Sequence, residues 1–160
     1  MKSWMQERRQ DRGTVRHATL RCALLVLGCM VAVSASATAP TGRYAVTKDT
    51  VLDNVTKLTW QREHHLKTYN LKDAKTYCSA LPLDKGGWRL PTLKELLTLV
   101  DRSVKLPAID LIAFPNTKSY LFWTTTLYAP SSGEAWLVDF SWGNASNISV
   151  SNVLQVRCVR

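Results

Sequence analysis

Cys78 and Cys158 are the two residues whose type and spacing indicate the clearest chemistry in this 160-residue chain. The other two cysteines, Cys22 and Cys29, lie in an N-terminal stretch that we expect to be removed. An even pair of cysteines in an exported domain is typical of a disulfide. This bond would close most of the domain, and chain-entropy arguments credit such a loop with about 4 kcal/mol of stability. Two buried free thiols are the alternative.

Glu63, His64 and His65 are the other cluster of titratable residues that suggests chemistry. Neighbouring histidines rarely bind one metal ion together, and no further ligand residue stands at a recognisable spacing. We therefore expect both histidines in an exposed loop. Glu63 lacks a partner for acid/base work. The sequence thus predicts no catalytic residue, no metal site and no cofactor, and we expect a protein that is not an enzyme.

Binding candidates are easier to find than catalytic ones. Trp142 lies in a turn where an exposed ring can stack on a sugar, and Tyr128 lies in a loop that we expect nearby. Lysine and arginine side chains would supply affinity for a polyanion. The candidates are Lys67, Lys72, Lys75, Lys85, Arg102, Lys105 and Lys118. The alternatives are a Trp142 that covers the end of a sheet and cations that form only a solvated surface.

The N-terminus has the pattern of a secretory signal peptide. Residues 1–21 are basic, residues 22–33 are apolar, and small residues follow up to Ala39. We expect residues 1–39 to be removed by cleavage after Ala39, with Ala37 as the competing position. The protein would then be exported, to the periplasm or to the outside of the cell.

Two alternatives to a cleaved signal stay open, a single membrane anchor and a lipoprotein attached through Cys29. The apolar run is shorter than the 20 or so residues that span a bilayer, so we expect no stable span after processing. Residues 40–160 keep 15 basic and 10 acidic side chains, a net charge of +5. This mild excess fits weak attraction to anionic polymers, and export argues against nucleic acid as a partner.

Residues 40–160 are long enough for one domain with a modest core. Asn70 can cap a first helix that Pro82 ends, and Thr92 with Glu95 forms a capping box for a second. The order is strands, two helices and further strands, which indicates an α+β domain. We expect helices at 71–81 and 93–100, and strands at 43–47, 50–52, 58–60, 120–126, 135–140, 147–150 and 153–159. The spacing points Cys78 and Cys158 into the core, well placed to pair.

Five strings in this domain resemble the Lcl C-terminal domain family, in the order in which that family has them. The most specific are WRLPTLKELL at 88–97 and VRCVR at 156–160. The others are VLDNVTKLTW at 51–60, FWTT at 122–125 and AWLVDF at 135–140. The resemblance covers nearly all of residues 43–160.

The resemblance implies a C-type-lectin-like fold, with two helices on an antiparallel sheet and one disulfide that matches Cys78 and Cys158. The family is named for a collagen-like adhesin whose C-terminal domain engages sulfated glycosaminoglycans, which implies a glycan or polyanion ligand here. Lys57 stands where the family usually has glycine, so that turn is expected to differ. No collagen-like repeat precedes the domain. The strings at 114–116 and 142–144 lack the acids of a lectin calcium site.

We therefore expect an exported, non-catalytic module that binds carbohydrate or an anionic polysaccharide, with adhesion as its role. A domain that contacts an envelope protein, as a subunit or scaffold, is the main alternative. A hydrolase would need a clustered acid/base pair, which the sequence does not indicate. The fold implied by the resemblance is related to that of the formylglycine-generating sulfatase modifiers, which use a reactive cysteine. Both cysteines of this domain are assigned to the disulfide, so we do not expect that activity.

Overall fold

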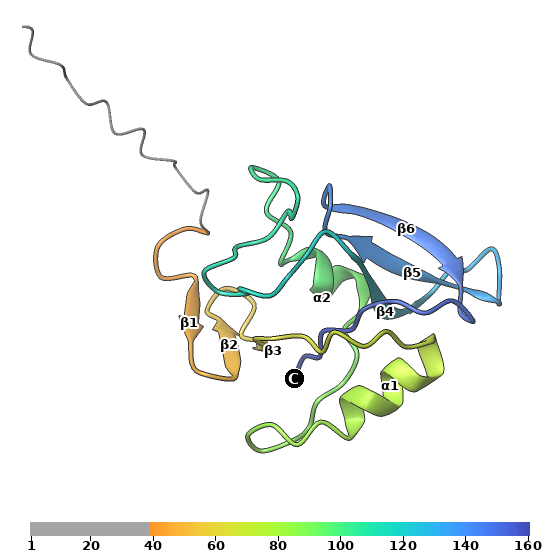
Figure 1. Cartoon of the computed structure of the whole chain (residues 1–160), viewed down its shortest axis with the longest axis horizontal. Helices are drawn as coiled ribbons and strands as arrows, with labels where there is room; N and C mark the ends of the chain where they lie inside the picture. The colour runs from red at the N-terminus through yellow and green to blue at the C-terminus, as the bar shows by residue number, and fades with distance from the viewer. Residues whose placement is uncertain (1–38) are drawn as a thin grey trace, which may run out of the picture. The chain divides into compact units, whose positions relative to one another are not determined.

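A computed structural model describes residues 39–160, which form two three-stranded antiparallel sheets and two helices (Figure 1). The elements run β1 (Tyr44–Val46), β2 (Thr50–Asp53), β3 (Thr59–Gln61), α1 (Leu71–Ser79), α2 (Leu93–Leu97), β4 (Leu121–Leu127), β5 (Glu134–Asp139) and β6 (Asn144–Ser149). The strand orders are β1-β2-β3 and β4-β5-β6. The α+β prediction is confirmed. The predicted signal peptide and Cys29 lie outside the described residues, except for Ala39.

The turn between β2 and β3 has Lys57 in a backbone conformation that glycine usually adopts. Asp53 Oδ1 accepts the amide of Val55, and Lys57 adopts a positive φ of 63°. Such a backbone is costly for a residue with a Cβ. The Asp53 carboxylate, which is fully buried, also receives the guanidinium of Arg43 at 3.2 Å. These contacts hold the turn in a conformation that glycine would adopt more easily.

Both helices begin where the sequence predicts and end earlier. The Asn70 side chain accepts the amide of Asp73, and the capping box of Thr92 and Glu95 is complete. α1 ends at Ser79, two residues before the predicted end. After α2 the backbone continues to Val100 through bonds to the third residue back, which tighten the turn beyond an α-helix. No helix within residues 39–160 is long and apolar enough to cross a membrane.

The second sheet contains one strand that the sequence pattern underestimates. β4 and β5 match the prediction closely, whereas β6 begins at Asn144 instead of at residue 147. Six consecutive pairs join β5 to β6, from Glu134 opposite Ser149 to Asp139 opposite Asn144. The missed half of β6 is polar and exposed, so it carries no hydrophobic alternation.

Residues 153–159 do not form the predicted strand. This segment belongs to neither sheet, although it is extended and makes isolated bridges to Tyr69, Phe122, Trp60 and Arg89. Residues 154–159 are all buried, because both sides of the segment face other parts of the domain. We expected only alternate residues to point inward. The hydrophobic alternation of a half-exposed strand therefore does not apply here.

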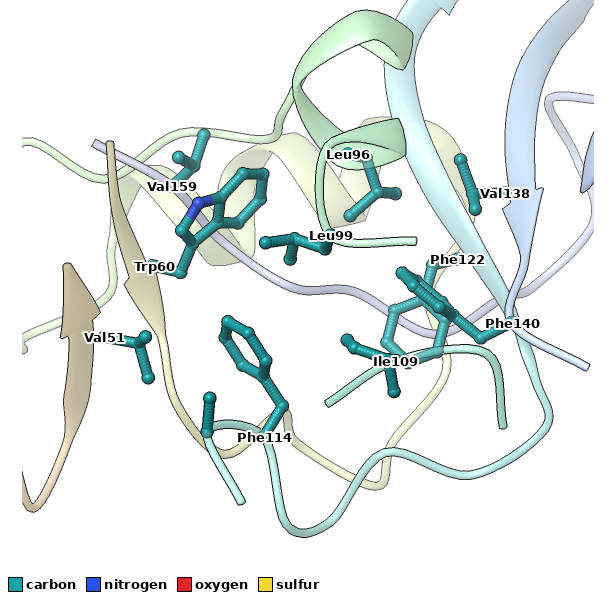
Figure 2. Packing of buried hydrophobic residues seen from close by; sticks show 11 residues of the cluster. Val51, Trp60, Leu96, Leu99, Ile109, Phe114, Phe122, Val138, Phe140 and Val159 are labelled. Atoms are coloured by element: carbon teal, nitrogen blue, oxygen red, sulfur yellow. The ribbon is translucent and has the colours of Figure 1, made fainter. Parts of the chain in front are cut away.

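Two clusters of apolar side chains form the core, and the C-terminal segment contributes to both. One gathers Trp60, Phe114, Phe122 and their neighbours between the sheets and α2 (Figure 2). The other surrounds the disulfide of Cys78 and Cys158, whose bond is 2.06 Å long. The predicted disulfide is confirmed, and the free-thiol alternative is wrong.

Three of the five tryptophans in residues 39–160 belong to the core. Trp60, Trp88 and Trp123 are buried. Trp136 is only half-buried, and its ring lies 5.3 Å from that of Tyr128 in an edge-to-face arrangement. The Trp123 indole donates to the backbone oxygen of Tyr69 at 2.7 Å, which ties β4 to the segment that leads into α1.

Candidate functional site

No lysine within residues 39–160 takes part in a salt bridge. The three salt bridges within residues 39–160 all use arginine: Arg43 with Asp53, Arg89 with Glu95, and Arg160 with Asp84. The seven predicted cationic candidates are exposed, and none of them belongs to a salt bridge in this part of the chain. These charges are therefore available to a ligand.

Two of these lysines lie together on α1. Lys72 and Lys75 are three residues apart, so they share one face of the helix. Both line a groove of about 450 Å³ that runs beside the β4–β5 loop. The other lining residues are Asn70, Leu71, Thr76, Leu127, Ser132 and Val150. The groove thus combines a partly apolar surface with two ammonium groups.

The groove is supported by backbone contacts from several directions. The amide of Leu71 donates to the oxygen of Val150, and the amide of Val150 donates to Gly133. Tyr69 and Leu154 exchange two backbone hydrogen bonds of 2.9 and 3.0 Å. α1 is thereby fixed at its N-terminus against both walls of the groove. The Lys67 ammonium lies 5.4 Å from the Tyr69 ring centre, beside this end of the helix.

Trp142 lies in the predicted turn, which joins β5 to β6, and its ring is exposed. Its side chain is 52 % exposed, and the Lys105 ammonium lies 5.2 Å from its ring centre. Gly143 fixes this turn with a φ of 74°, and a Cβ there would lie 2.5 Å from Cγ1 of Val100. Trp142 is thus held on a rigid turn, with a cation over one part of its ring.

The remaining candidate residues lie neither in the groove beside α1 nor beside Trp142. Tyr128 lies at the opposite end of β5 from Trp142, so the expectation of nearby loops is wrong. Arg102 lines a cavity that also contains Asp101 and Asp110, which offset its charge. Lys118 lines a third cavity, and Lys85 follows Asp84, the partner of Arg160. The sequence candidates are therefore spread over the surface, not gathered in one site.

The prediction for the histidines is half wrong. His65 is exposed, but His64 is only 4 % exposed and lies edge-on to Phe122, with ring centres 5.0 Å apart. Burial, with the positive charges of Arg157, His65 and Lys118, lowers the pKa of His64 from 6.5 to about 4. The local sequence holds no signal for this, because residues distant in the chain bury the ring.

Arg89 has a structural role in an ion pair with Glu95. Arg89 binds both carboxylate oxygens of Glu95, at 2.8 and 2.6 Å. This pairing, with the amide and hydroxyl of Thr92, lowers the pKa of Glu95 to about 2 although burial opposes it. Glu95 is therefore held ionised in an ion pair. Within residues 39–160, no three His, Cys, Asp or Glu side chains gather closely enough to hold a metal ion.

The model of the Lcl C-terminal domain family matches residues 49–160 of this chain. The matched region contains both helices, the second sheet, the disulfide and the groove beside α1. A search of curated proteins found no match.

Proposed function

Because this chain belongs to the Lcl C-terminal domain family, we propose that it is an exported, non-catalytic module that binds an anionic glycan. We further propose that its two sheets and two helices form a variant of the C-type-lectin-like fold. The ligand class comes from the family resemblance, in which the C-terminal domain of an adhesin engages sulfated glycosaminoglycans. An adhesive role at the cell surface or in the periplasm follows from the same premise.

The groove beside α1 is the observation that carries this proposal. Lys72 and Lys75 lie on one helix face at its edge and have no acidic partner in residues 39–160. A carboxylate or sulfate would receive charge-assisted hydrogen bonds from the ammonium groups. The apolar side chains of Leu127 and Val150 can contact the face of a sugar ring. The shape is open and shallow, which suits one stretch of a long polymer better than an enclosed small molecule.

The binding test uses the disulfide-bonded protein and an array of neutral, uronic-acid and sulfated glycans. We expect binding to a polyanion at low salt that weakens at high salt, because salt screens exposed charges. The double variant Lys72→Ala/Lys75→Ala should weaken binding roughly tenfold, since each exposed ion pair contributes up to about 1 kcal/mol. The matched control, Lys48→Ala/Lys94→Ala, removes the same charge outside the groove and should bind like the parent.

Three outcomes would contradict the proposal. The first is no polyanion binding even at low salt. The second is equal weakening in both double variants, which would indicate attraction to the net charge and not to the groove. Salt-insensitive binding to a neutral sugar would move the site to Trp142 instead. Trp142→Ala would then abolish binding while the two lysine variants left it intact.

A protein partner is the second candidate function, and an exposed apolar stretch favours it. Leu106, Leu111 and Ile112 are 61 %, 45 % and 67 % exposed in the loop that precedes β4. Where exposed apolar side chains form one patch, they mark an interaction site. Crosslinking followed by mass spectrometry would test this candidate. A crosslinked envelope protein that Ile112→Ser removes, in a protein without glycan affinity, would replace the glycan proposal.

A further inference from the structure

A second candidate site surrounds Arg157, whose charge is fully buried. Its Nη1 atom donates to the backbone oxygens of Gln61 and Arg62, both at 2.6 Å, and Nη2 donates to Thr117 Oγ1 at 2.6 Å. The guanidinium also lies 4.7 Å from the ring centre of Phe114. None of the carboxylates in residues 39–160 forms a salt bridge with it. Neutral oxygens and an aromatic ring thus hold a buried cation.

Several polar atoms around Arg157 have no hydrogen-bond partner in the described part of the chain. They are Arg157 Nε, both ring nitrogens of His64, and Gln155 Oε1. His64 is 4 % exposed and Gln155 is 7 % exposed. A buried polar atom without a partner costs about 1–3 kcal/mol. Arg157 Nε and one imidazole nitrogen carry unused N–H groups, whereas the other imidazole nitrogen and Gln155 Oε1 are unused acceptors.

A cavity of about 260 Å³ opens beside this cluster, lined by Leu66, Pro115, Asn116 and Lys118. The segments that line the cavity, around Leu66 and at residues 115–118, also contact the buried groups. Thr117 lies between two lining residues, and Gln155 Nε2 donates to the oxygen of Leu66 at 3.3 Å. Lys118 is close enough to His64 to contribute to its electrostatic surroundings. The cavity therefore has an exposed ammonium at its rim, and Thr117 between its lining residues contacts the buried guanidinium of Arg157.

We propose that this cavity binds the carboxylate of an organic acid, held by Lys118 and by the positive field of Arg157. Lys118 at the rim and Arg157 behind Thr117 are both positively charged, which disfavours a cation as the ligand. Leu66, which is 68 % exposed, and Pro115 provide apolar walls for the body of the acid. The Asn116 amide can donate to the second carboxylate oxygen. A single rim lysine suits one negative charge better than a polyanionic chain.

This site is separate from the groove beside α1, since the two share no lining residue. The carboxylate can belong to a free small acid or to a uronic acid within a glycan. Both present the same group to Lys118. The body attached to the carboxylate distinguishes them, because Leu66 and Pro115 favour an apolar chain over a hydroxylated ring.

Titration of the isotope-labelled, disulfide-bonded protein, followed by amide NMR shifts, tests the proposal. The ligands are butyrate, glucuronate and sodium sulfate, with sodium chloride as the ionic-strength control. We expect saturable shifts at residues 64–66 and 116–118 with a carboxylate and not with chloride. Tighter binding of butyrate would identify a free acid as the ligand, and tighter binding of glucuronate would identify a glycan uronate.

Lys118→Ala should weaken carboxylate binding about tenfold, because it removes a charge-assisted hydrogen bond. Lys94→Ala, the matched control outside both cavities, should leave it unchanged. Leu66→Ser should weaken butyrate more than glucuronate. Shifts that never saturate, sulfate that binds as tightly as the carboxylates, or equal affinity in Lys118→Ala would each overturn the proposal. None of these results depends on whether the α1 groove binds a glycan.

Discussion

Acid should destabilise this domain through His64 in a defined pH window. Burial beside Arg157 and Lys118 lowers the pKa of His64 to about 4, against 6.5 in the unfolded chain. A group with a depressed basic pKa binds more protons when unfolded, so stability falls as the pH drops from 6.5 towards 4. The difference of about 2.5 pKa units corresponds to about 3 kcal/mol. No acidic side chain is among the groups that shift this pKa.

Urea unfolding at pH 7.5 and at pH 4.5 measures the effect. The free energy of unfolding should fall by about 2–3 kcal/mol in the parent protein across this window. His64→Phe removes the titrating ring with little change in shape and should lose much less. His65→Gln, which alters the exposed neighbour, should fall like the parent. Glu95, with a pKa of about 2, contributes only at lower pH, because stability from a depressed carboxyl pKa is lost below about 4.5.

The reasoning is refuted if the parent protein keeps its stability at pH 4.5. It is also refuted if His64→Phe loses as much stability as the parent, because the loss would then arise elsewhere. Retention of the native amide spectrum at pH 7.5 in both variants is the control that the fold is intact before acid is added.

Three further predictions concern stability and use the same urea measurement. Cys78→Ala/Cys158→Ala should lower the free energy of unfolding by about 4 kcal/mol, and no loss would contradict a closed 80-residue loop. Lys57→Gly should raise it by about 1 kcal/mol, because the residue has a φ of 63°, and a decrease would show that the lysine side chain matters more than the backbone. Gly143→Ala should lower it by about 2 kcal/mol through a Cβ 2.5 Å from Val100, and a neutral result would mean that the turn shifts freely.

Local signals in the sequence were enough for the features that depend on neighbouring residues. The caps at Asn70 and Thr92 are set within one helical turn, so side-chain type and spacing identify them. The disulfide was predictable because only two cysteines follow the apolar run, and the pattern around each places it in the core. The family strings added the identity of the domain, which no local rule supplies.

Features that depend on distant parts of the chain escaped the same reasoning. The ring of His64 is buried by Phe122, Arg157 and their surroundings, more than 50 residues later. The segment at 154–159 has the alternation of a strand but is covered on both sides. Tyr128 and Trp142 are close in sequence, yet the length of β5 separates them. In each case tertiary packing, not local preference, decides the outcome.

The C-terminal segment also has a consequence for how the domain folds. The amides of Thr59 and Gln61 in β3 donate to the oxygens of Arg160 and Cys158, about 100 residues away in the chain. The first sheet therefore gains these bonds only when the far end of the chain arrives. Contacts of such long sequence separation slow folding, because the loop must close before they contribute. The first sheet should not be a stable intermediate by itself, and its formation should be comparatively slow.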